Sequence, residues 1–311
     1  MIHLINFENY TVEMIEQIID KSIKIKNCPG EYSDVLRGKK MYMLFQKTST
    51  RTALSFGMGM NDLGGYFFSQ NWQDSNFAVA DICDEVRYVG RNADIIMARL
   101  KENRDIEKMA KHSTIPVING CCNKFHPCQS LADMMTIKER FGSYNIKLLY
   151  IGVHNNVLNS LMETLPALGG NLYAITPIIN GPSIDERVTK QAIDTGRYHV
   201  VDPSISLDEL KELVNSMDVI YTDSWIDMEF FHDESYREEK EKRIKIMQPF
   251  QINSNLLNMT NAVVMHDMPI HSGFEISREV VEKNIDIIMQ QSENRRHAQN
   301  GALITLLNCN V

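Results

Sequence analysis

Four consecutive residues, Ser49, Thr50, Arg51 and Thr52, have types and spacing that suit the binding of an anion. They follow the apolar run 41–45, which predicts a buried parallel strand, and they precede residues with helical apolar spacing. The start of a helix has unpaired N–H groups and a dipole that favour an anion. The guanidinium of Arg51 adds forked donors that suit a phosphate. This turn therefore predicts a phosphate site or, as the simpler alternative, a hydroxyl-rich helix cap with a surface arginine.

Polar side chains also follow several other predicted strands. In parallel α/β sheets, ligands bind beyond the carboxyl ends of the strands. A single arginine or histidine in such a place is more often a surface or packing group. Their repetition along this chain predicts a ligand site that draws on Arg99, His126, Gln129, Asn155, Asn156, Asp223, His266 and Asp267.

The elements that must position these residues alternate between short apolar strands and helices. The pattern restarts after residues 142–145, where we expect a domain boundary. Alternation of this kind predicts an α/β fold with two domains, each with a parallel sheet flanked by helices, linked by interdomain helices. We place the first domain at 1–141, joined by the C-terminal helix at 293–311, and the second at 142–292. The expected strands are 41–45, 65–68, 94–99, 115–118, 146–151, 171–176, 199–201, 218–221 and 262–265.

The composition excludes several classes of protein. A chain of 311 residues suggests two domains of about 150 residues each. Its 43% hydrophobic and 23% charged residues are typical of a soluble globular protein. A net charge of −8 argues against a nucleic-acid partner but permits a local cationic pocket. No apolar run has the length of a membrane span, the first residues lack a signal-peptide layout, and the six cysteines lack zinc-type spacing. We therefore expect a cytoplasmic protein with reduced thiols and no metal.

Several segments together resemble the aspartate/ornithine carbamoyltransferase family. Residues 49–52 match the family's carbamoyl-phosphate signature, and 126–129 match its second signature. Residues 223–225, 265–269 and 293–295 resemble segments of the ornithine branch. Both signatures in one chain are far more specific than a single motif. The resemblance covers nearly the whole chain and implies an enzyme that moves the carbamoyl group of carbamoyl phosphate to an amine, with no cofactor.

The resemblance also implies a role for each matching residue. The first domain would bind carbamoyl phosphate, with the carbonyl oxygen on His126, the NH₂ group on Gln129, and Arg99 bridging phosphate and carbonyl. Fixed donors there would stabilise the charge that forms on that oxygen as the amine attacks. The expected catalytic residues are Arg51, Arg99, His126, Gln129 and Arg295. The expected carbamoyl-phosphate ligands are these five with Ser49, Thr50, Thr52 and Trp72. The second domain would bind the acceptor through Asn155, Asn156, Asp223, Asp227, Met228, Asp267 and Met268.

The acceptor side departs from the family's pattern. Asp227 and Glu229 replace the serine and glycine of a mobile Ser-Met-Gly loop, and Asp267 replaces a cysteine. The three carboxylates favour a more cationic acceptor, unless the loop residues simply face water. L-ornithine, which gives citrulline, is the expected acceptor. The alternatives are putrescine, lysine or an N-acylated ornithine, and a protein that binds carbamoyl phosphate without catalysis.

Trp72 lies in a polar loop at 69–76. In this family that loop crosses to complete the active site of the neighbouring subunit. The resemblance therefore implies a homotrimer with shared active sites. It also implies a place in arginine biosynthesis.

Overall fold

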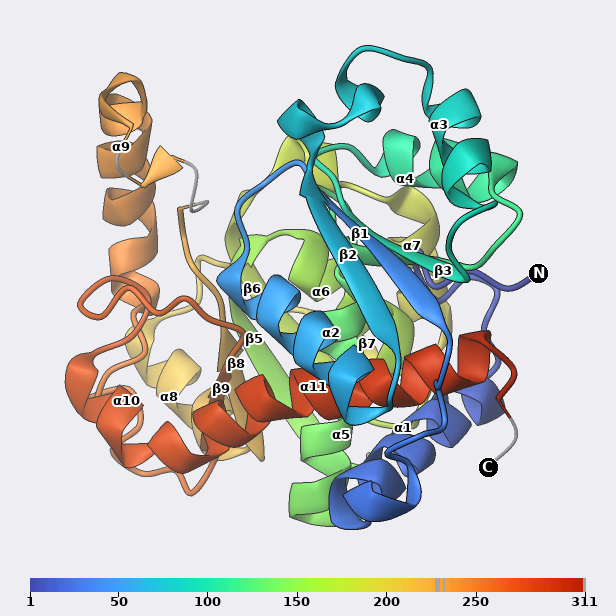
Figure 1. The fold of residues 1–311 in the computed structure, drawn as a ribbon. Coiled ribbons are helices and arrows are strands. Elements are labelled where there is room, and N and C mark those ends of the chain that lie inside the picture. Colours follow the sequence, from blue (N-terminus) through green and yellow to red (C-terminus); the bar gives the residue numbers. More distant parts are fainter. Residues whose placement is uncertain (227–229, 232, 310–311) are drawn as a thin grey trace. The chain divides into compact units, whose positions relative to one another are not determined.

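The computed structural model describes residues 1–226, 230–231 and 233–309. The chain divides into two compact units, Met1–Met135 with Glu293–Val311, and Thr136–Ser292. Both divisions fall inside helices, α5 (Pro127–Phe141) and α11 (Ile285–Leu306), so each helix runs from one unit into the other. Figure 1 shows the strands and helices along the chain. The expected fold of two α/β units linked by helices is confirmed.

The first unit contains a parallel sheet with the strand order β2-β1-β3-β4. In register, Phe45 pairs with Arg99 across β1 and β3, and Arg99 pairs with Cys121 across β3 and β4. The carboxyl ends of these three strands therefore lie together at one edge of the sheet. β2 extends three residues into the segment expected to be a loop, as far as Asn71. The strands are β1 (Lys40–Phe45), β2 (Tyr66–Asn71), β3 (Ile95–Arg99) and β4 (Val117–Cys121).

The helices of the first unit follow from local signals in the sequence. Thr11 caps α1 by accepting a hydrogen bond from Met14 N–H, and Asp81 caps α3 in the same way. A Cβ on Gly301 of α11 would lie 2.1 Å from Oγ of Ser22 in α1, so glycine permits the close approach of these two helices. The helices are α1 (Val12–Asn27), α2 (Thr50–Asp62), α3 (Ile82–Val89) and α4 (Asn103–His112), with 3₁₀ turns at Pro29–Glu31, Trp72–Asp74 and Asn76–Ala78.

The second unit contains a parallel sheet with the order β7-β6-β5-β8-β9. Thr222, the last residue of β8, pairs with His266, the last residue of β9. β5 continues to His154, beyond the expected end at Ile151, because its buried run continues through Val153. The strands are β5 (Lys147–His154), β6 (Asn171–Ile179), β7 (Tyr198–Val200), β8 (Val219–Thr222) and β9 (Val263–His266).

A hydrophobic core joins strands of the second unit to its helices. Ile220 of β8 and Val264 of β9 pack with Val214 of α8 and Val280 of α10. α9 (Arg237–Met247) is rich in charged residues, and Met247 is its buried residue among those described. The helices are α6 (Asn156–Thr164), α7 (Glu186–Asp194), α8 (Leu207–Asn215), α9 (Arg237–Met247) and α10 (Arg278–Lys283), with 3₁₀ turns at Gly181–Ser183, Glu234–Tyr236 and Gln248–Phe250. Within the described ranges, none of the helices is both long and apolar enough to cross a membrane.

Candidate active site

The turn between β1 and α2 has the strand-to-helix geometry expected from the sequence. Ser49 is the extended residue that caps α2, and its hydroxyl accepts a hydrogen bond from Thr52 N–H at 3.1 Å. Thr50 is exposed and Arg51 is half-buried. The first turn of α2 contains no acidic residue. The helix dipole and the Arg51 guanidinium can therefore act on an anion at this turn without competition from a carboxylate of that first turn.

Two further arginines meet at Thr52. Arg99 donates from Nη1 to Thr52 Oγ1 at 3.3 Å, and Arg295 of α11 donates from Nη2 to the same oxygen at 3.1 Å. The Thr52 side chain is fully buried, and Arg295 is only 4% exposed. Positive charge is therefore concentrated beside the N-terminus of α2, where an anionic ligand would compensate it.

Gln129 joins the same group of residues. Its Oε1 accepts a hydrogen bond from Arg295 Nη1 at 3.0 Å, and its Nε2 donates to Asp133 Oδ1 at 2.9 Å. These two contacts fix which end of the amide is oxygen, because an arginine can only donate. Gln129 is thus held with its oxygen toward Arg295. Asp133 was not expected from the sequence, although its i, i+4 spacing from Gln129 on one helix was an available signal.

His126 precedes α5 and is buried. Burial lowers its pKa well below the usual 6.5, and the positive charges of Arg295, Arg99 and Arg51 lower this pKa further. The imidazole is therefore neutral at physiological pH and carries one N–H donor. A neutral donor can bind a carbonyl oxygen without adding a fourth positive charge to this site.

The lowered pKa of His126 should make the folded state less stable at acidic pH. Because the pKa of His126 is lowered in the fold, only the unfolded chain takes up this proton just below pH 6.5. Stability rises with pH wherever the unfolded state binds more protons, so it should fall as the pH decreases from 7.5 to 5.5. His126→Asn should remove about 1 kcal/mol of that loss at pH 5.5, as measured by urea unfolding at several pH values. Identical pH dependence in the two proteins would contradict this assignment.

In the second unit, Asn155 and Asp223 lie at the carboxyl ends of the neighbouring strands β5 and β8. Asn155 Oδ1 caps α6 by accepting from Val157 N–H at 3.0 Å and Leu158 N–H at 3.2 Å. Its Nδ2 donates to Asp223 Oδ2 at 2.5 Å. Asp223 is 9% exposed. The pair presents a fixed carboxylate, which can bind an ammonium group.

Tyr150 supports this pair from within β5. Its hydroxyl donates to Val153 O at 2.8 Å and lies 3.3 Å from Asn155 Oδ1. Burial raises the pKa of Tyr150 well above 10, and the negative charges of Asp223 and Asp267 raise this pKa further. The hydroxyl therefore remains a hydrogen-bond donor. No sequence signal singled out this tyrosine, because its role depends on the neighbouring strands.

Asp267 and Met268 directly follow β9. The Asp267 side chain is 10% exposed, and its Oδ1 lies 3.7 Å from His266 Nδ1, too far for a hydrogen bond. Met268 has a φ of 61°, in a region that residues other than glycine rarely adopt. Asn156, the first residue of α6, is half-buried. The expected acceptor residues Asp227 and Met228, and also Glu229, lie outside the described residues.

Trp72 does not belong to the group around Thr52. It lies in the 3₁₀ turn after β2, and its ring centroid is 5.8 Å from that of Phe77. The described part of the chain contains no group of three or more His, Cys, Asp or Glu side chains that could hold a metal ion. Among the expected site residues, hydrogen bonds join Thr52, Arg99, Gln129 and Arg295 in the first unit. In the second unit they join Asn155 and Asp223.

Comparison with known proteins matches both halves of the chain to one family. Residues 2–139 match the model of the carbamoyl-P binding domain of aspartate/ornithine carbamoyltransferase, and residues 144–306 match its Asp/Orn binding domain. The anabolic ornithine carbamoyltransferase of Pyrococcus furiosus is 37% identical over 310 residues, which cover 98% of this chain and 96% of that protein. The ornithine carbamoyltransferase of Moritella profunda is 35% identical over 315 residues, 99% of this chain and 100% of that protein.

Solved structures agree with this match. Ornithine carbamoyltransferase from P. furiosus has a TM-score of 0.89 at 35% identity, and covers 99% of this chain and 98% of its own. The anabolic ornithine carbamoyltransferase of Campylobacter jejuni has a TM-score of 0.87 at 27% identity, with 99% of both chains covered. The order of the motifs, the geometry of each unit and these matches lead to one conclusion. The chain belongs to the aspartate/ornithine carbamoyltransferase family.

Proposed function

We propose that this protein transfers the carbamoyl group of carbamoyl phosphate to L-ornithine and releases citrulline and phosphate. The observation that carries the proposal is the convergence of Arg99 and Arg295 on Thr52 at the N-terminus of α2. Relatives named ornithine carbamoyltransferase, at 35–37% identity over nearly the full chain, support ornithine as the acceptor. The first domain, 1–141 with 293–311, would bind carbamoyl phosphate, and the second, 142–292, would bind ornithine.

The proposed donor site uses charge and fixed dipoles. The phosphate binds the turn at 49–52, with Arg51 as its main cation and Arg99 reaching both phosphate and carbonyl. Neutral His126 donates to the carbonyl oxygen. Gln129 Oε1 already accepts from Arg295, and its second lone pair is available to the NH₂ of the carbamoyl group. Arg295 adds positive charge on the carbamoyl side.

The reaction needs little chemistry from protein side chains. The neutral side-chain amine of ornithine attacks the carbonyl carbon, and negative charge builds on the carbonyl oxygen. Fixed donors stabilise that charge without reorganising during the reaction. The bond to the phosphate oxygen then breaks, and the departing phosphate accepts the proton of the amine. Positioning and electrostatics therefore supply most of the acceleration.

On the acceptor side, Asp223 is proposed to bind an ammonium group of ornithine, with its carboxylate oriented by Asn155. Asn156, Asp267 and Met268 are proposed as further contacts at the same edge of the sheet. Asp227 and Met228 remain proposed contacts on the basis of the family pattern alone. An α-ammonium paired with a fixed carboxylate would place the reacting amine at the far end of the side chain.

An assay of citrulline formation and phosphate release tests this function. In parallel reactions, purified protein is incubated with carbamoyl phosphate together with one amine: ornithine, putrescine, lysine or N-acetylornithine. We expect turnover with ornithine at the highest kcat/KM. Turnover with another amine but none with ornithine would overturn the assignment of ornithine as the acceptor. Binding of carbamoyl phosphate with no phosphate release from any amine would overturn catalysis.

Asp267 favours a second candidate acceptor, a more cationic amine such as putrescine. The negative charges of Asp267 and Asp223 both raise the pKa of Tyr150, so two carboxylates lie near this edge of the sheet. A carboxylate there disfavours an acceptor that itself carries a carboxylate. The amine panel separates the two candidates.

Asp267→Cys should shift the preference of the enzyme toward ornithine. Removing the charge should raise kcat/KM for ornithine about tenfold relative to putrescine, which corresponds to about 1.4 kcal/mol of repulsion. Asp267→Asn is the matched control, because it removes the charge and keeps the volume. An unchanged ratio in both variants would show that Asp267 has no influence on the acceptor.

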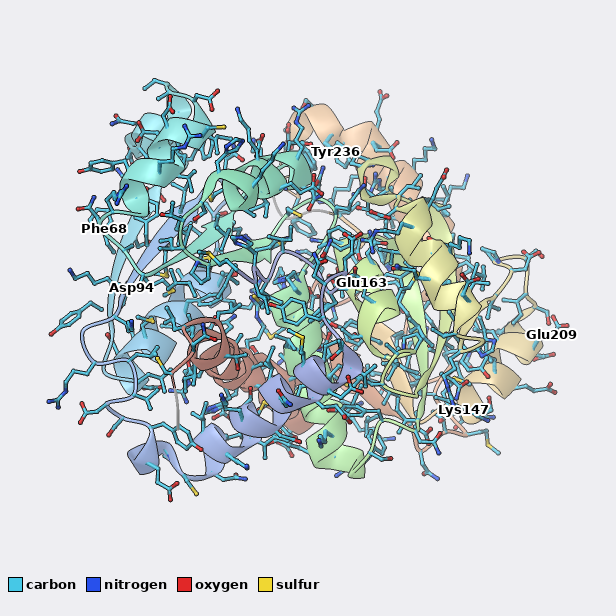
Figure 2. All side chains as sticks on the ribbon, turned by 90° about the vertical axis from the view of Figure 1, so that its right-hand side faces the viewer. Phe68, Asp94, Lys147, Glu163, Glu209 and Tyr236 are labelled. Carbon is cyan, nitrogen blue, oxygen red and sulfur yellow. The ribbon has the colours of Figure 1, made fainter. Side chains whose placement is uncertain are left out.

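A homotrimer with shared active sites is also proposed, and an apolar surface of the first unit supports an assembly. β2 is an edge strand of its sheet, and Tyr66 and Phe68 of β2 are 66% and 61% exposed. Figure 2 shows the position of Phe68 at the edge of the sheet. These residues help to line a cavity of about 670 Å³. An exposed apolar edge of this kind commonly marks a contact with another chain.

Sedimentation equilibrium tests the assembly. We expect the mass of a trimer for the native chain and a smaller species for Phe68→Asp. A monomeric native protein with full activity would overturn the trimer. Mixing an Arg51→Ala chain with a Trp72→Ala chain would test site sharing, because mixed trimers should recover activity if Trp72 acts across subunits.

We also propose a cytoplasmic enzyme of arginine biosynthesis. The word "anabolic" in the names of the P. furiosus and C. jejuni proteins supports this role for the present chain. Expression in a bacterial strain that lacks ornithine carbamoyltransferase tests it. Growth without added arginine is expected, and failure to grow despite measured citrulline formation would contradict the biosynthetic direction.

A further inference from the structure

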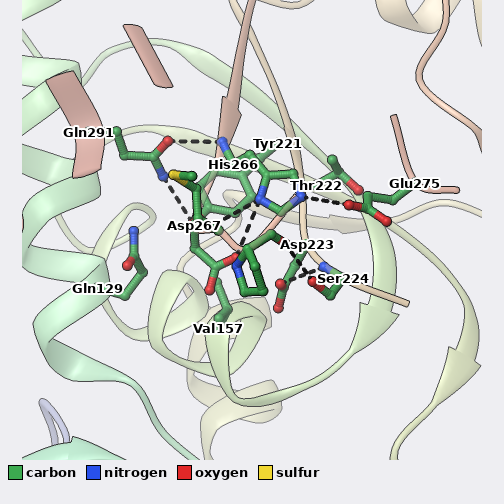
Figure 3. Close-up of polar contacts among 12 residues, drawn as sticks. Gln129, Val157, Tyr221, Thr222, Asp223, Ser224, His266, Asp267, Glu275 and Gln291 are labelled. Atoms are coloured by element: carbon green, nitrogen blue, oxygen red, sulfur yellow. Dashed lines mark hydrogen bonds and ion pairs between the residues drawn. The ribbon is translucent and has the colours of Figure 1, made fainter. Parts of the chain in front are cut away.

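The loop that follows β9 is attached to the rest of the second unit at several points. We call residues 266–271, which are the last residue of β9 and the five residues after it, the acceptor loop, because they include the proposed acceptor contacts Asp267 and Met268. At its start, His266 N–H donates to Gln291 Oε1 at 2.9 Å. In its middle, Pro269 O accepts from Ser224 Oγ at 2.8 Å. Figure 3 shows these attachments around His266 and Ser224.

Glu275 makes the remaining attachments, through a single oxygen. Its Oε1 accepts from His271 N–H at 2.5 Å and lies 3.2 Å from His266 Nε2. The carboxylate therefore binds both ends of the acceptor loop. Glu275 is 1% exposed and His266 is fully buried, so water does not compete for these bonds.

The imidazole of His266 extends this attachment to the middle of the acceptor loop. Met268 N–H donates to His266 Nδ1 at 2.8 Å, so Nδ1 must carry a lone pair. The proton of the neutral ring is then on Nε2, where it donates to Glu275. A continuous chain of hydrogen bonds thus runs from the Glu275 carboxylate through the ring to the Met268 backbone.

Met268 shows why the acceptor loop needs such support. Its φ of 61° lies in the left-handed region, which costs free energy in any residue with a side chain. A backbone of this kind persists only where its surroundings hold it. The hydrogen bond from Met268 N–H to His266 holds the residue from inside the loop, and Glu275 fixes the ring that accepts this bond.

We propose that Glu275 is a positioning residue of the acceptor site. It fixes the tautomer and orientation of His266, and through that ring and His271 it holds Asp267 and Met268 in one conformation. The inference rests on the proposed function, since it assigns the acceptor loop to ornithine. Without the carboxylate, the Nε2–H of His266 becomes a buried donor with no acceptor from Glu275, and the acceptor loop samples other conformations. Glu275 itself does not contact the substrate.

Steady-state kinetics of Glu275 variants test the proposal. Glu275→Ala should raise the KM for ornithine about 10- to 100-fold, because small displacements of binding groups are costly. The KM for carbamoyl phosphate should stay within about twofold, since the donor site is built by the other unit. Glu275→Gln should stay close to the native values, because one amide oxygen can accept both hydrogen bonds. Glu279→Ala is the matched control, an exposed glutamate on α10.

Hydrogen exchange provides a second measurement that needs no turnover. Amides in 266–271 should exchange faster in Glu275→Ala, whereas those of β8 should keep the native rate. A folded Glu275→Ala protein with native exchange and native KM for ornithine would overturn the proposal. So would a Glu275→Gln protein as impaired as the alanine variant.

Ser224→Ala covers the case in which Glu275→Ala does not fold. It removes the second attachment, at Pro269, from a half-buried hydroxyl, and should raise loop exchange and the KM for ornithine by a smaller factor. No change in either would overturn the role of an anchored loop. A native protein that makes no citrulline would refute the proposed function alone, because the exchange comparison still tests Glu275.

Discussion

Arg51→Ala is expected to lower kcat/KM for carbamoyl phosphate by about 10²- to 10³-fold, since truncating one partner of a charged, hydrogen-bonded pair costs several kcal/mol. Arg51 lies in the first turn of α2, where the helix N-terminus and two other arginines concentrate positive charge around Thr52. Its guanidinium is proposed to bind the phosphate bidentately. Steady-state kinetics at several fixed ornithine concentrations measure the loss.

The folded state should be little affected by this change, because Arg51 is only half-buried. The melting temperature without ligand should therefore match that of the native protein. Carbamoyl phosphate should raise the melting temperature of the native protein and not that of the variant. Arg87→Ala is the control, an arginine 57% exposed and paired with Asp84 on the surface of α3. Normal saturation of the Arg51→Ala protein by carbamoyl phosphate would show that this turn does not bind carbamoyl phosphate.

His126→Leu is expected to lower kcat by about 10²- to 10³-fold, the usual effect of removing one donor to a developing oxyanion. Burial and three arginines keep the His126 imidazole neutral, so its contribution is one directed N–H group. The proposed hydrogen bond to the carbonyl oxygen would strengthen as charge builds on that oxygen. The KM for carbamoyl phosphate should change only a few-fold, because the proposed phosphate contacts at 49–52 are not altered.

Leucine approximates the volume of the imidazole, so packing around position 126 should be preserved. His112→Leu, in the last turn of α4, is the control for loss of a histidine in the same unit. A kcat within threefold of the native value would mean that His126 does not touch the reacting carbonyl. A raised KM for carbamoyl phosphate with an unchanged kcat would mean that His126 binds the ground state and the transition state equally.

Local signals in the sequence were sufficient for the turn at 49–52. The apolar run before it and the helical spacing after it determined a strand, a turn and a helix, and Ser49 is the cap residue that such a turn requires. The same reasoning predicted the parallel sheets and the alternation of their strands with helices, because hydrophobic periodicity follows directly from burial on one or two faces.

The ends of the elements were less predictable. β2 and β5 continue beyond their expected ends because neighbouring strands pair with the additional residues. α11 begins at Ile285 rather than near Glu293, in a segment whose apolar residues Ile287 and Ile288 are buried. Pairing and burial depend on other segments of the chain, which no local window contains.

The candidate site was predictable as a list of residues through the resemblance to the family. The contacts that hold these residues together were not predictable from the sequence. Arg295 reaches Thr52 across 243 positions of sequence and Gln129 across 166, so the packing of α11 beside α2 and α5 decides these contacts. Asp133, Tyr150 and Glu275 matched no signature, and their hydrogen bonds to other groups of the chain appear only in the folded structure.

The turn at Ser49–Thr52 thus shows what the sequence by itself determined about this protein. A cap residue, a helix dipole and a cationic side chain are properties of adjacent residues, and they are sufficient to predict an anion site. Only the tertiary structure decided how the distant groups named by the resemblance meet beside that turn. Arg99 comes from the end of a neighbouring strand and Arg295 from the last helix, and both meet at one hydroxyl. Contacts of this kind form only when the whole unit folds, because their free energy depends on burial shared by remote segments.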